Sequence, residues 1–451
     1  MYFEKLRTKR VAVLGLGVSN RPLMRLLLEK GIDVTGCDRT PREKLDDEVL
    51  ELERQGAKLH LGEGYLQGIC ADVAFRTPGL HPETPELVQL RNAGTKITSE
   101  MEAFFEVCPC PIIGVTGSDG KTTTTTLISE LLKKAGHRVW VGGNIGTPLL
   151  DQVPKMEPTD KVVLELSSFQ LMDLHYSCHT AVVTNLAPNH LDVHKDMEEY
   201  VLAKKNIFLK QTGADTLILN MDNELTASFA PEAAGKVRQF SRLAVPEDGV
   251  YLQDGVIYRN GTEVLRQEDI LLPGIHNVEN YMAAILAVDS MVSEEDIRAV
   301  AKSFGGVEHR IELVRVKDGV SYYNDSIASS PSRTIAGLRS FEKRVILIAG
   351  GYDKNLPFEE LGEEICARVK VLVCTGATGK KIANAVRNAQ GAQEYLPQIL
   401  EIEDFYEAVR AASQKAEPGD VVILSPAGAA FDKFKNFMVR GKEFKKTVME
   451  L

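Results

Sequence analysis

The segment 111–126, PIIGVTGSDGKTTTTT, constrains the fold of this chain more than any other. Apolar residues lead into glycines, then Lys121 and a run of threonines, and the helical pattern LISELLKK follows. This order predicts a strand, a glycine loop and a helix. Glycines let the backbone turn its N–H groups inward, and the start of the helix adds free N–H groups and the positive end of its dipole.

Such a loop suits a nucleoside triphosphate. Lys121 supplies a point charge for the β and γ phosphates, and the hydroxyl of Thr122 suits Mg²⁺. The spacing is GxxGxxGKT, because Val115 stands where the common P-loop has a glycine, and the alternative is an ordinary βα turn with a chance GKT. We expect ATP to contact Gly117, Ser118, Asp119, Gly120, Lys121, Thr122 and Thr123.

Length and charge limit the class of protein. A chain of 451 residues predicts about three domains. The net charge of −10 argues against a general nucleic-acid or membrane-surface binder. No apolar run approaches the ~20 residues of a membrane span, the first ten residues lack an apolar signal core, and the seven cysteines are scattered. We therefore expect a cytoplasmic protein with reduced thiols and no membrane insertion.

The pattern of apolar runs and helices predicts three consecutive α/β domains, at 1–105, 106–306 and 307–451. The first is Rossmann-like, because GLGVSN follows an apolar strand and Asp38 ends the next one. Gly15 and Gly17 match the dinucleotide fingerprint, whereas Asn20 takes the third glycine position. We expect a nucleotide or nucleotide-sugar there; NAD and a bare βα turn are the alternatives.

The central domain is expected to be a P-loop-type ATPase with a mostly parallel sheet, whose strands are buried on both faces. Polar residues follow these strands where ligands bind in such folds: Asn144, Glu165, Ser167 and His190. Glu165 interrupts an apolar run, and a buried carboxylate needs either a metal such as Mg²⁺ or a structural arginine or lysine. His190 either completes an Mg²⁺ shell or bonds the backbone; its spacing to His194 lacks the glutamate of a zinc HExxH motif.

Two helical segments of this domain carry polar residues of interest. Lys204 and Lys205 are typical of a solvated helix face. Asn277 and Asn280, near the start of a later helix, either contact a base edge or cap the helix.

The third domain repeats the strand, loop and helix pattern and is expected to be Rossmann-like.

Nine motifs occur together in one order: IGVTGSDGKTTTT, GGNIGTPL, LELSSFQL, NLAPNHLDVH, PGIHNVEN, EHRIE, NDSIASSP, IAGG and LSPAGAAFDKFKNF. With GLGVSN they resemble the Mur ligases along almost the whole chain, and most of all the members that join D-glutamate to UDP-N-acetylmuramoyl-L-alanine in peptidoglycan synthesis. The resemblance implies that ATP phosphorylates the L-alanine carboxylate and that the amine of D-glutamate attacks the acyl phosphate.

The resemblance also implies roles for single residues. Lys121, His190 and Lys204 are the implied catalytic residues. Thr122 and Glu165 would hold one Mg²⁺, and His190 with a carbamylated Lys204 would hold a second; Lys205 is the alternative for carbamylation. The remaining implied ATP contacts are Asn277, Asn280, Arg310 and Asp325.

The substrates would lie at both ends of the chain. The implied contacts of UDP are Ser19, Asp38, Arg39, Thr77, Pro78 and Gly79. Those of the muramoyl end are Asn144, Ser167 and Gln170, and those of D-glutamate are Ser329, Lys354, Phe431 and Phe437. Two residues depart from relatives: Ile327 replaces a lysine and Ala430 a serine.

Three alternatives remain open at this point. The chain is a related amide ligase for another amino acid, a nucleotide-regulated binding protein without ligation, or an NAD oxidoreductase built on GLGVSN. We expect a monomer.

Overall fold

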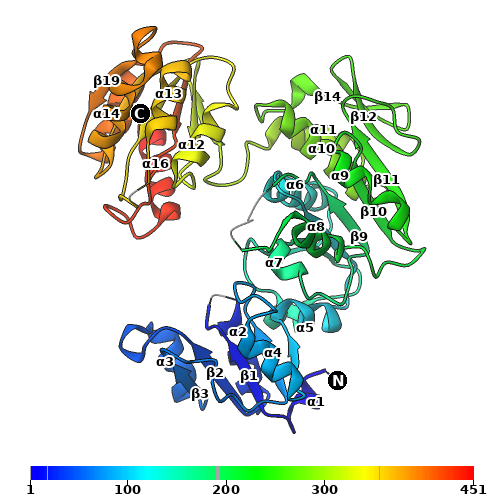
Figure 1. The fold of residues 1–451 in the computed structure, drawn as a ribbon. Coiled ribbons are helices and arrows are strands. Elements are labelled where there is room, and N and C mark those ends of the chain that lie inside the picture. The colour runs from blue at the N-terminus through cyan, green and yellow to red at the C-terminus, as the bar shows by residue number, and fades with distance from the viewer. Residues whose placement is uncertain (1, 18, 189–192, 355) are drawn as a thin grey trace. The chain divides into compact units, whose positions relative to one another are not determined.

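The computed structural model describes residues 2–17, 19–188, 193–354 and 356–451, and contains three sheets (Figure 1). By their contacts the residues form two compact units. One comprises residues 1–269 and 278–300, and the other 270–277 and 301–451. None of the described helices is long and apolar enough to cross a membrane.

The first sheet is entirely parallel and has the order β3-β2-β1-β4-β5. Its strands are β1 (Val11–Leu14), β2 (Val34–Asp38), β3 (Lys58–Leu61), β4 (Val73–Arg76) and β5 (Lys96–Thr98). The helices of this part are α1 (Tyr2–Leu6), α2 (Asn20–Glu29), α3 (Asp47–Arg54), α4 (Pro85–Asn92) and α5 (Glu100–Val107). The chain reverses its winding direction at β1, so the loops after β1 and β4 meet at the crevice where ligands bind in open α/β sheets.

The second sheet has the order β14-β13-β12-β11-β10-β9-β6-β8-β7. Its strands are β6 (Ile112–Thr116), β7 (Val139–Gly143), β8 (Lys161–Glu165), β9 (Thr180–Val183), β10 (Thr216–Asn220), β11 (Lys236–Ser241), β12 (Gly249–Gln253), β13 (Val256–Arg259) and β14 (Thr262–Arg266). Strands β6 to β12 pair in parallel, and β12, β13 and β14 pair antiparallel as two hairpins. Every residue of β6 is buried, because β6 lies between β8 and β9.

The helices that follow these strands are α6 (Lys121–Lys134), α7 (Ser168–Leu171), α8 (Met197–Lys205), α9 (Glu224–Ala227), α10 (Ile275–Ala287) and α11 (Glu294–Ser303). Helix α6 begins directly after the glycine loop, as the sequence predicts.

The third sheet has the order β15-β16-β20-β17-β18-β19 and is parallel except for β15. Its strands are β15 (Glu312–Lys317), β16 (Val320–Asn324), β17 (Val345–Ala349), β18 (Val369–Cys374), β19 (Gln398–Glu401) and β20 (Val421–Leu424). Its helices are α12 (Pro331–Leu338), α13 (Glu359–Arg368), α14 (Gly379–Asn388), α15 (Phe405–Gln414) and α16 (Phe437–Glu450). An apolar cluster covers each face of this sheet, so its central strands are buried on both sides.

Candidate active site

The glycine loop between β6 and α6 adopts backbone conformations that favour glycine. Gly117 has φ 145° and Gly120 has φ 77°. A Cβ atom on Gly117 would lie 2.0 Å from Thr184 Oγ1, and one on Gly120 would lie 2.4 Å from Asn280 Oδ1. These two glycines therefore let the loop approach the end of β9 and helix α10 closely.

Polar groups at the end of β9 hold the loop in place. The backbone N–H of Ser118 donates to Asn185 O at 2.8 Å, and that of Asp119 donates to Asn185 Oδ1 at 2.9 Å. Thr184 Oγ1 donates to Asp119 O at 2.6 Å. Sequence reasoning missed Thr184 and Asn185; their only signal was a polar pair directly after an apolar strand.

Lys121 is the first residue of α6, and its ammonium group lies over the loop. Nζ donates to Gly117 O at 3.0 Å and to Ser118 O at 2.8 Å. Thr122 is buried and Thr123 half-buried in the first turn of the helix. A cation and a helix N-terminus thus occur within a few residues, an arrangement that suits a phosphate group.

Glu165 ends β8, where β8 pairs with β6 beside the loop. Its side chain is buried, and Oε1 accepts a hydrogen bond from Asn144 Nδ2 at 2.7 Å. Within the described part of the chain, Oε2 has no hydrogen-bond partner and the carboxylate forms no ion pair. A buried carboxylate oxygen with no protein partner is a suitable ligand for a divalent cation, so this residue fits the expected Mg²⁺.

Lys204 lies on α8 and is 2% exposed. Nζ donates to Gly117 O at 2.8 Å and to Thr116 Oγ1 at 3.2 Å. Burial, and then the nearby charge of Lys121, hold the pKa of Lys204 well below its ordinary value. The solvated-face interpretation is therefore wrong for Lys204. Lys205 points elsewhere, with Nζ 2.5 Å from Glu232 Oε1.

His190 lies outside the described residues, so its expected role at a metal is untested. Over the ranges that the structure does describe, no group of three or more His, Cys, Asp and Glu side chains forms a metal site. His194 is buried; its Nε2 lies 2.9 Å from Ser168 Oγ, and its ring stacks on Phe169 with centroids 5.2 Å apart. Burial lowers the pKa of His194, as expected for a neutral packed imidazole.

Apart from the glycine-loop site, a second pocket lies where the first sheet meets α7. Three residues that the resemblance implies for the substrate line it together: Ser19 and Pro78, expected at UDP, and Gln170, expected at the muramoyl end. Ser167 and Gln170 also form a capping box at the start of α7. The remaining lining residues are Asn20, Arg76, Ser99, Glu100, Met101 and Phe169.

Asp38 supports the glycine turn of the first sheet. Its Oδ2 accepts the N–H of Leu16 at 2.7 Å and its Oδ1 accepts that of Thr40 at 2.8 Å. Burial acts to raise the pKa of Asp38, but these hydrogen bonds outweigh it and hold the pKa below its ordinary value. Arg39 beside it is exposed.

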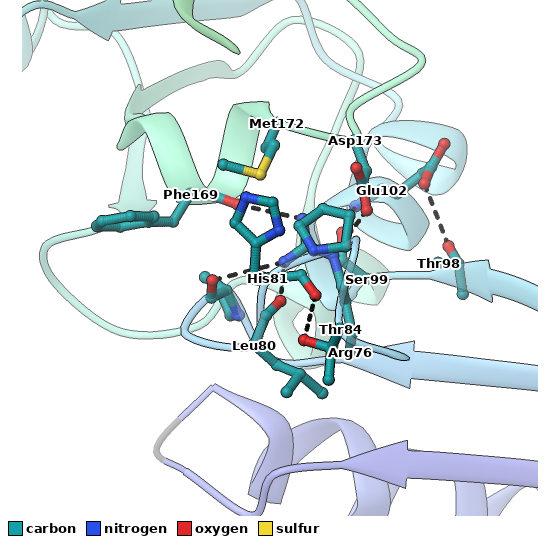
Figure 2. A network of polar contacts seen from close by, with 12 residues as sticks. Arg76, Leu80, His81, Thr84, Thr98, Ser99, Glu102, Phe169, Met172 and Asp173 are labelled. Atoms are coloured by element: carbon teal, nitrogen blue, oxygen red, sulfur yellow. Dashed lines mark hydrogen bonds and ion pairs between the residues drawn. The ribbon is translucent and has the colours of Figure 1, made fainter. Parts of the chain in front are cut away.

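The turn after β4, which contains Thr77, Pro78 and Gly79, packs against the same glycine turn. A Cβ atom on Gly15 would lie 2.7 Å from Thr77 Cγ2. Arg76, which precedes this turn, was not predicted from the sequence. Figure 2 shows its hydrogen bonds to Leu80 in this turn and to Phe169 and Asp173 at and after α7.

The second compact unit holds the remaining predicted residues. Asp325 Oδ2 accepts a hydrogen bond from Ser425 Oγ at 2.7 Å; burial raises the pKa of Asp325 to about 7, against the opposing effect of Arg310. Asn277 Nδ2 donates to Pro273 O at 2.6 Å, and its expected role at a base edge or as a cap stays a prediction.

The predicted amino-acid contacts of this unit follow or adjoin the carboxyl ends of its strands. Ser329 N donates to Ile327 O at 2.8 Å, and Lys354 is exposed. Phe431 is 65% exposed and contacts Tyr352 edge-on, with centroids 6.1 Å apart. The ring of Phe437 contacts His309 edge-on, and Ala430 is buried.

Comparisons with known proteins agree with this geometry. A family model of the Mur ligase middle domain matches residues 115–288, and one described as "Mur ligase, glutamate ligase domain" matches 309–428. UDP-N-acetylmuramoylalanine–D-glutamate ligase of Acetivibrio thermocellus is 52% identical, over 99% of this chain and 97% of that protein. The chain belongs to the Mur ligase family. A protein of the same name from Clostridium botulinum is 49% identical to this Mur ligase, over 99% and 98% of the two chains.

Solved structures support the fold of this Mur ligase. UDP-N-acetylmuramate–alanine ligase of Thermotoga maritima superimposes with a TM-score of 0.58 at 18% identity, over 98% of this chain and 99% of that one. A UDP-N-acetylmuramoyl-L-alanyl-D-glutamate–2,6-diaminopimelate ligase gives 0.57 at 19% identity, over 98% and 92%. The predicted family, and the three-part α/β fold, are confirmed.

Proposed function

We propose that this Mur ligase joins D-glutamate to UDP-N-acetylmuramoyl-L-alanine, converting ATP to ADP and phosphate, in peptidoglycan precursor synthesis. The observation that carries the proposal is the likeness to D-glutamate ligases, about 50% identical along nearly the full length of both chains. Lys121 and the N-terminus of α6, directly after the glycine loop, support the ATP-dependent half of the reaction.

The reaction proceeds in two transfers. A carboxylate oxygen of the L-alanine residue attacks the γ phosphorus and ADP leaves. The neutral amine of D-glutamate then attacks the acyl carbon, phosphate leaves, and the amine gives up a proton as the amide forms. Because both partners of the first step are anions, Lys121 and the N-terminus of α6 would neutralise the developing charge.

Metal binding fits the residues around the loop. Thr122 and Glu165 would hold one Mg²⁺, and His190 with a carbamylated Lys204 would hold a second. Bound Mg²⁺ would supply Lewis-acid stabilisation of the phosphoryl oxygens. The lowered pKa of Lys204 supports carbamylation, since only the neutral amine adds to CO₂, forming an N–C bond and releasing a proton.

The other predicted contacts are part of the same proposal. ATP would also contact Asn277, Asn280, Arg310 and Asp325. UDP would lie against Ser19, Asp38, Arg39, Thr77, Pro78 and Gly79, with the muramoyl end near Asn144, Ser167 and Gln170. D-glutamate would contact Ser329, Lys354, Phe431 and Phe437.

The domain boundaries at 105/106 and 306/307 also belong to the proposal. The distribution of the three sheets supports them, because each sheet draws its strands from one of these ranges. The proposed state of the protein is a cytoplasmic monomer.

An amino-acid panel tests the function. The protein is incubated with ATP, Mg²⁺ and UDP-N-acetylmuramoyl-L-alanine plus D-glutamate, L-glutamate or L-lysine, and both phosphate and amide product are measured. We expect D-glutamate to support at least tenfold faster turnover than the other two. Fastest turnover with another amino acid would favour the second candidate function, a related amide ligase. Ile327 and Ala430 motivate this candidate, because they replace polar residues of relatives. The loss of one charged hydrogen bond costs about 1.5–3 kcal/mol, which is enough to change the preferred amino acid.

A further inference from the structure

Arg76 is the last residue of β4 and is 2% exposed. Its Nε donates to Asp173 Oδ2 at 2.8 Å, and Nη2 donates to Phe169 O at 3.2 Å. Its Nη1 donates to Leu80 O at 3.0 Å, with the carbonyls of Thr77 and Pro78 at 3.4 and 3.5 Å (Figure 2). One guanidinium group therefore joins the turn after β4 to helix α7 and the residue just beyond it.

This connection limits how far the turn and α7 can move apart. The guanidinium is a rigid, planar fork, and its donors on both sides are engaged. A shift of either side would leave a buried charge or a buried carbonyl without a partner, which is unfavourable.

The two segments that Arg76 joins each contribute a wall to the second pocket. Pro78 comes from the turn, and Gln170 comes from α7. A ligand that contacts only one wall is insensitive to their separation. A ligand that contacts both walls requires the separation to be correct.

We propose that Arg76 is a positioning residue that sets the distance between the wall for the nucleotide and the wall for the muramoyl end. The inference rests on the proposed function, because it assigns these two parts of the substrate to the two walls. Arg76 then acts through the turn and α7 and need not touch the reacting atoms.

A second contact of the same turn supports this role. His81 Nε2 lies 3.3 Å from Glu199 Oε2 on α8, the helix that carries Lys204. The turn therefore contacts both α7, which follows the candidate metal ligand Glu165, and α8, which contains Lys204. Its position affects how the substrate lies relative to the glycine loop.

Binding measurements on Arg76→Lys test the proposal. Lysine keeps the charge but cannot donate to both walls at once. Calorimetry without ATP compares two probes, UDP and UDP-N-acetylmuramoyl-L-alanine. We expect the affinity for the complete substrate to fall at least tenfold and that for UDP to change less than threefold. In turnover, KM for the complete substrate should rise and KM for ATP should stay within twofold.

Two further variants separate positioning from folding. Arg238→Lys removes the fork of another buried arginine, which pairs with Asp248 at 2.9 Å and Asp289 at 2.6 Å. It should lower the melting temperature without changing the ratio of the two affinities. Asp173→Asn keeps the arginine, and it should change that ratio in the same direction as Arg76→Lys but by less.

The outcomes are distinct. If Arg76→Lys and Asp173→Asn weaken both probes equally, or change neither affinity while lowering the melting temperature, the positioning role is overturned. If the wild-type protein binds UDP-N-acetylmuramoyl-L-alanine no more tightly than UDP, the proposed function is overturned together with it. If the wild-type protein prefers D-glutamate in the amino-acid panel but the variants keep the wild-type ratio of the two affinities, only the positioning role is overturned.

Discussion

At the scale of single residues, the proposed chemistry depends on Lys204, an ionisable group that is buried. Lys204 and Lys205 are neighbours in sequence, yet only Lys204 reaches the glycine loop. The choice between them was open from the sequence, because the packing of α8 decides which side chain is buried.

Lys204→Ala should lower turnover at least 100-fold, because it removes the amine that would carry the second metal ligand. Small carboxylic acids should partly restore the rate by supplying oxygen ligands. Steady-state assays with and without formate or acetate measure both effects. Lys205→Ala is the matched control and should keep turnover within about threefold. Full activity of Lys204→Ala without additive would contradict carbamylation.

Glu100 gives a prediction about stability. It lines the second pocket, and burial raises its pKa from 4.5 to about 7 despite a hydrogen bond from the Leu150 N–H. The folded protein binds this proton more tightly than the unfolded chain. Stability therefore falls as pH rises from about 4.5 to 7, by about 3 kcal/mol at most.

Glu100→Gln should raise the melting temperature at pH 8 and have little effect near pH 4.5, where both side chains are neutral. Thermal unfolding across this pH range measures the gain. Glu43→Gln, at an exposed position, should show no comparable gain at pH 8. A Glu100→Gln gain that is constant with pH would mean that the carboxyl group is not the cause.

At the scale of elements, the strand, loop and helix around residues 112–134 are what sequence reasoning predicts best. The information is local: glycines mark the positions with positive φ, and the helical period begins at Lys121. The order of strands in the sheet was not predictable, because the buried parallel strands have similar apolar compositions. Thr184 and Asn185 were missed for that reason, since their role depends on β9 lying next to β6.

Two glycines at opposite ends of this region allow a matched test. Gly117→Ala places a Cβ atom 2.0 Å from Thr184 Oγ1, whereas Gly136→Ala, also at positive φ, meets no atom within 4 Å. Both substitutions carry backbone strain of about 1–2 kcal/mol, but only the first has a clash as well. We expect Gly136→Ala to lower stability alone and Gly117→Ala to lower ATP affinity at least tenfold. Calorimetric titration with ATP measures the difference; equal affinities would show that the loop is not held against β9.

At the scale of the whole molecule, each compact unit has its own apolar core. The family and the three-part α/β fold followed from the sequence because many short motifs occur in one order. Arg76 did not, since Asp173 is 97 positions away and nothing in the local pattern connects them. Side chains that join distant segments are invisible until the sheets are assembled.

The two cores should unfold in separate steps. UDP should stabilise only the unit that contains residues 1–269, by about 2.7 kcal/mol at 100 times Kd, which is roughly 5 °C for a unit of this size. Differential scanning calorimetry with and without UDP measures both transitions. A single transition that moves as a whole would contradict independent units.

The ion pair between Arg76 and Asp173 also limits how such a chain can be recombined. The arginine belongs to the first sheet, and its partner follows α7 in the segment after the second sheet's β8. A chimaera whose first 105 residues come from a relative without this arginine would leave Asp173 without its ion-pair partner. Exchange of the nucleotide-binding part therefore requires the cut to be made beyond residue 173, or both positions to be replaced together.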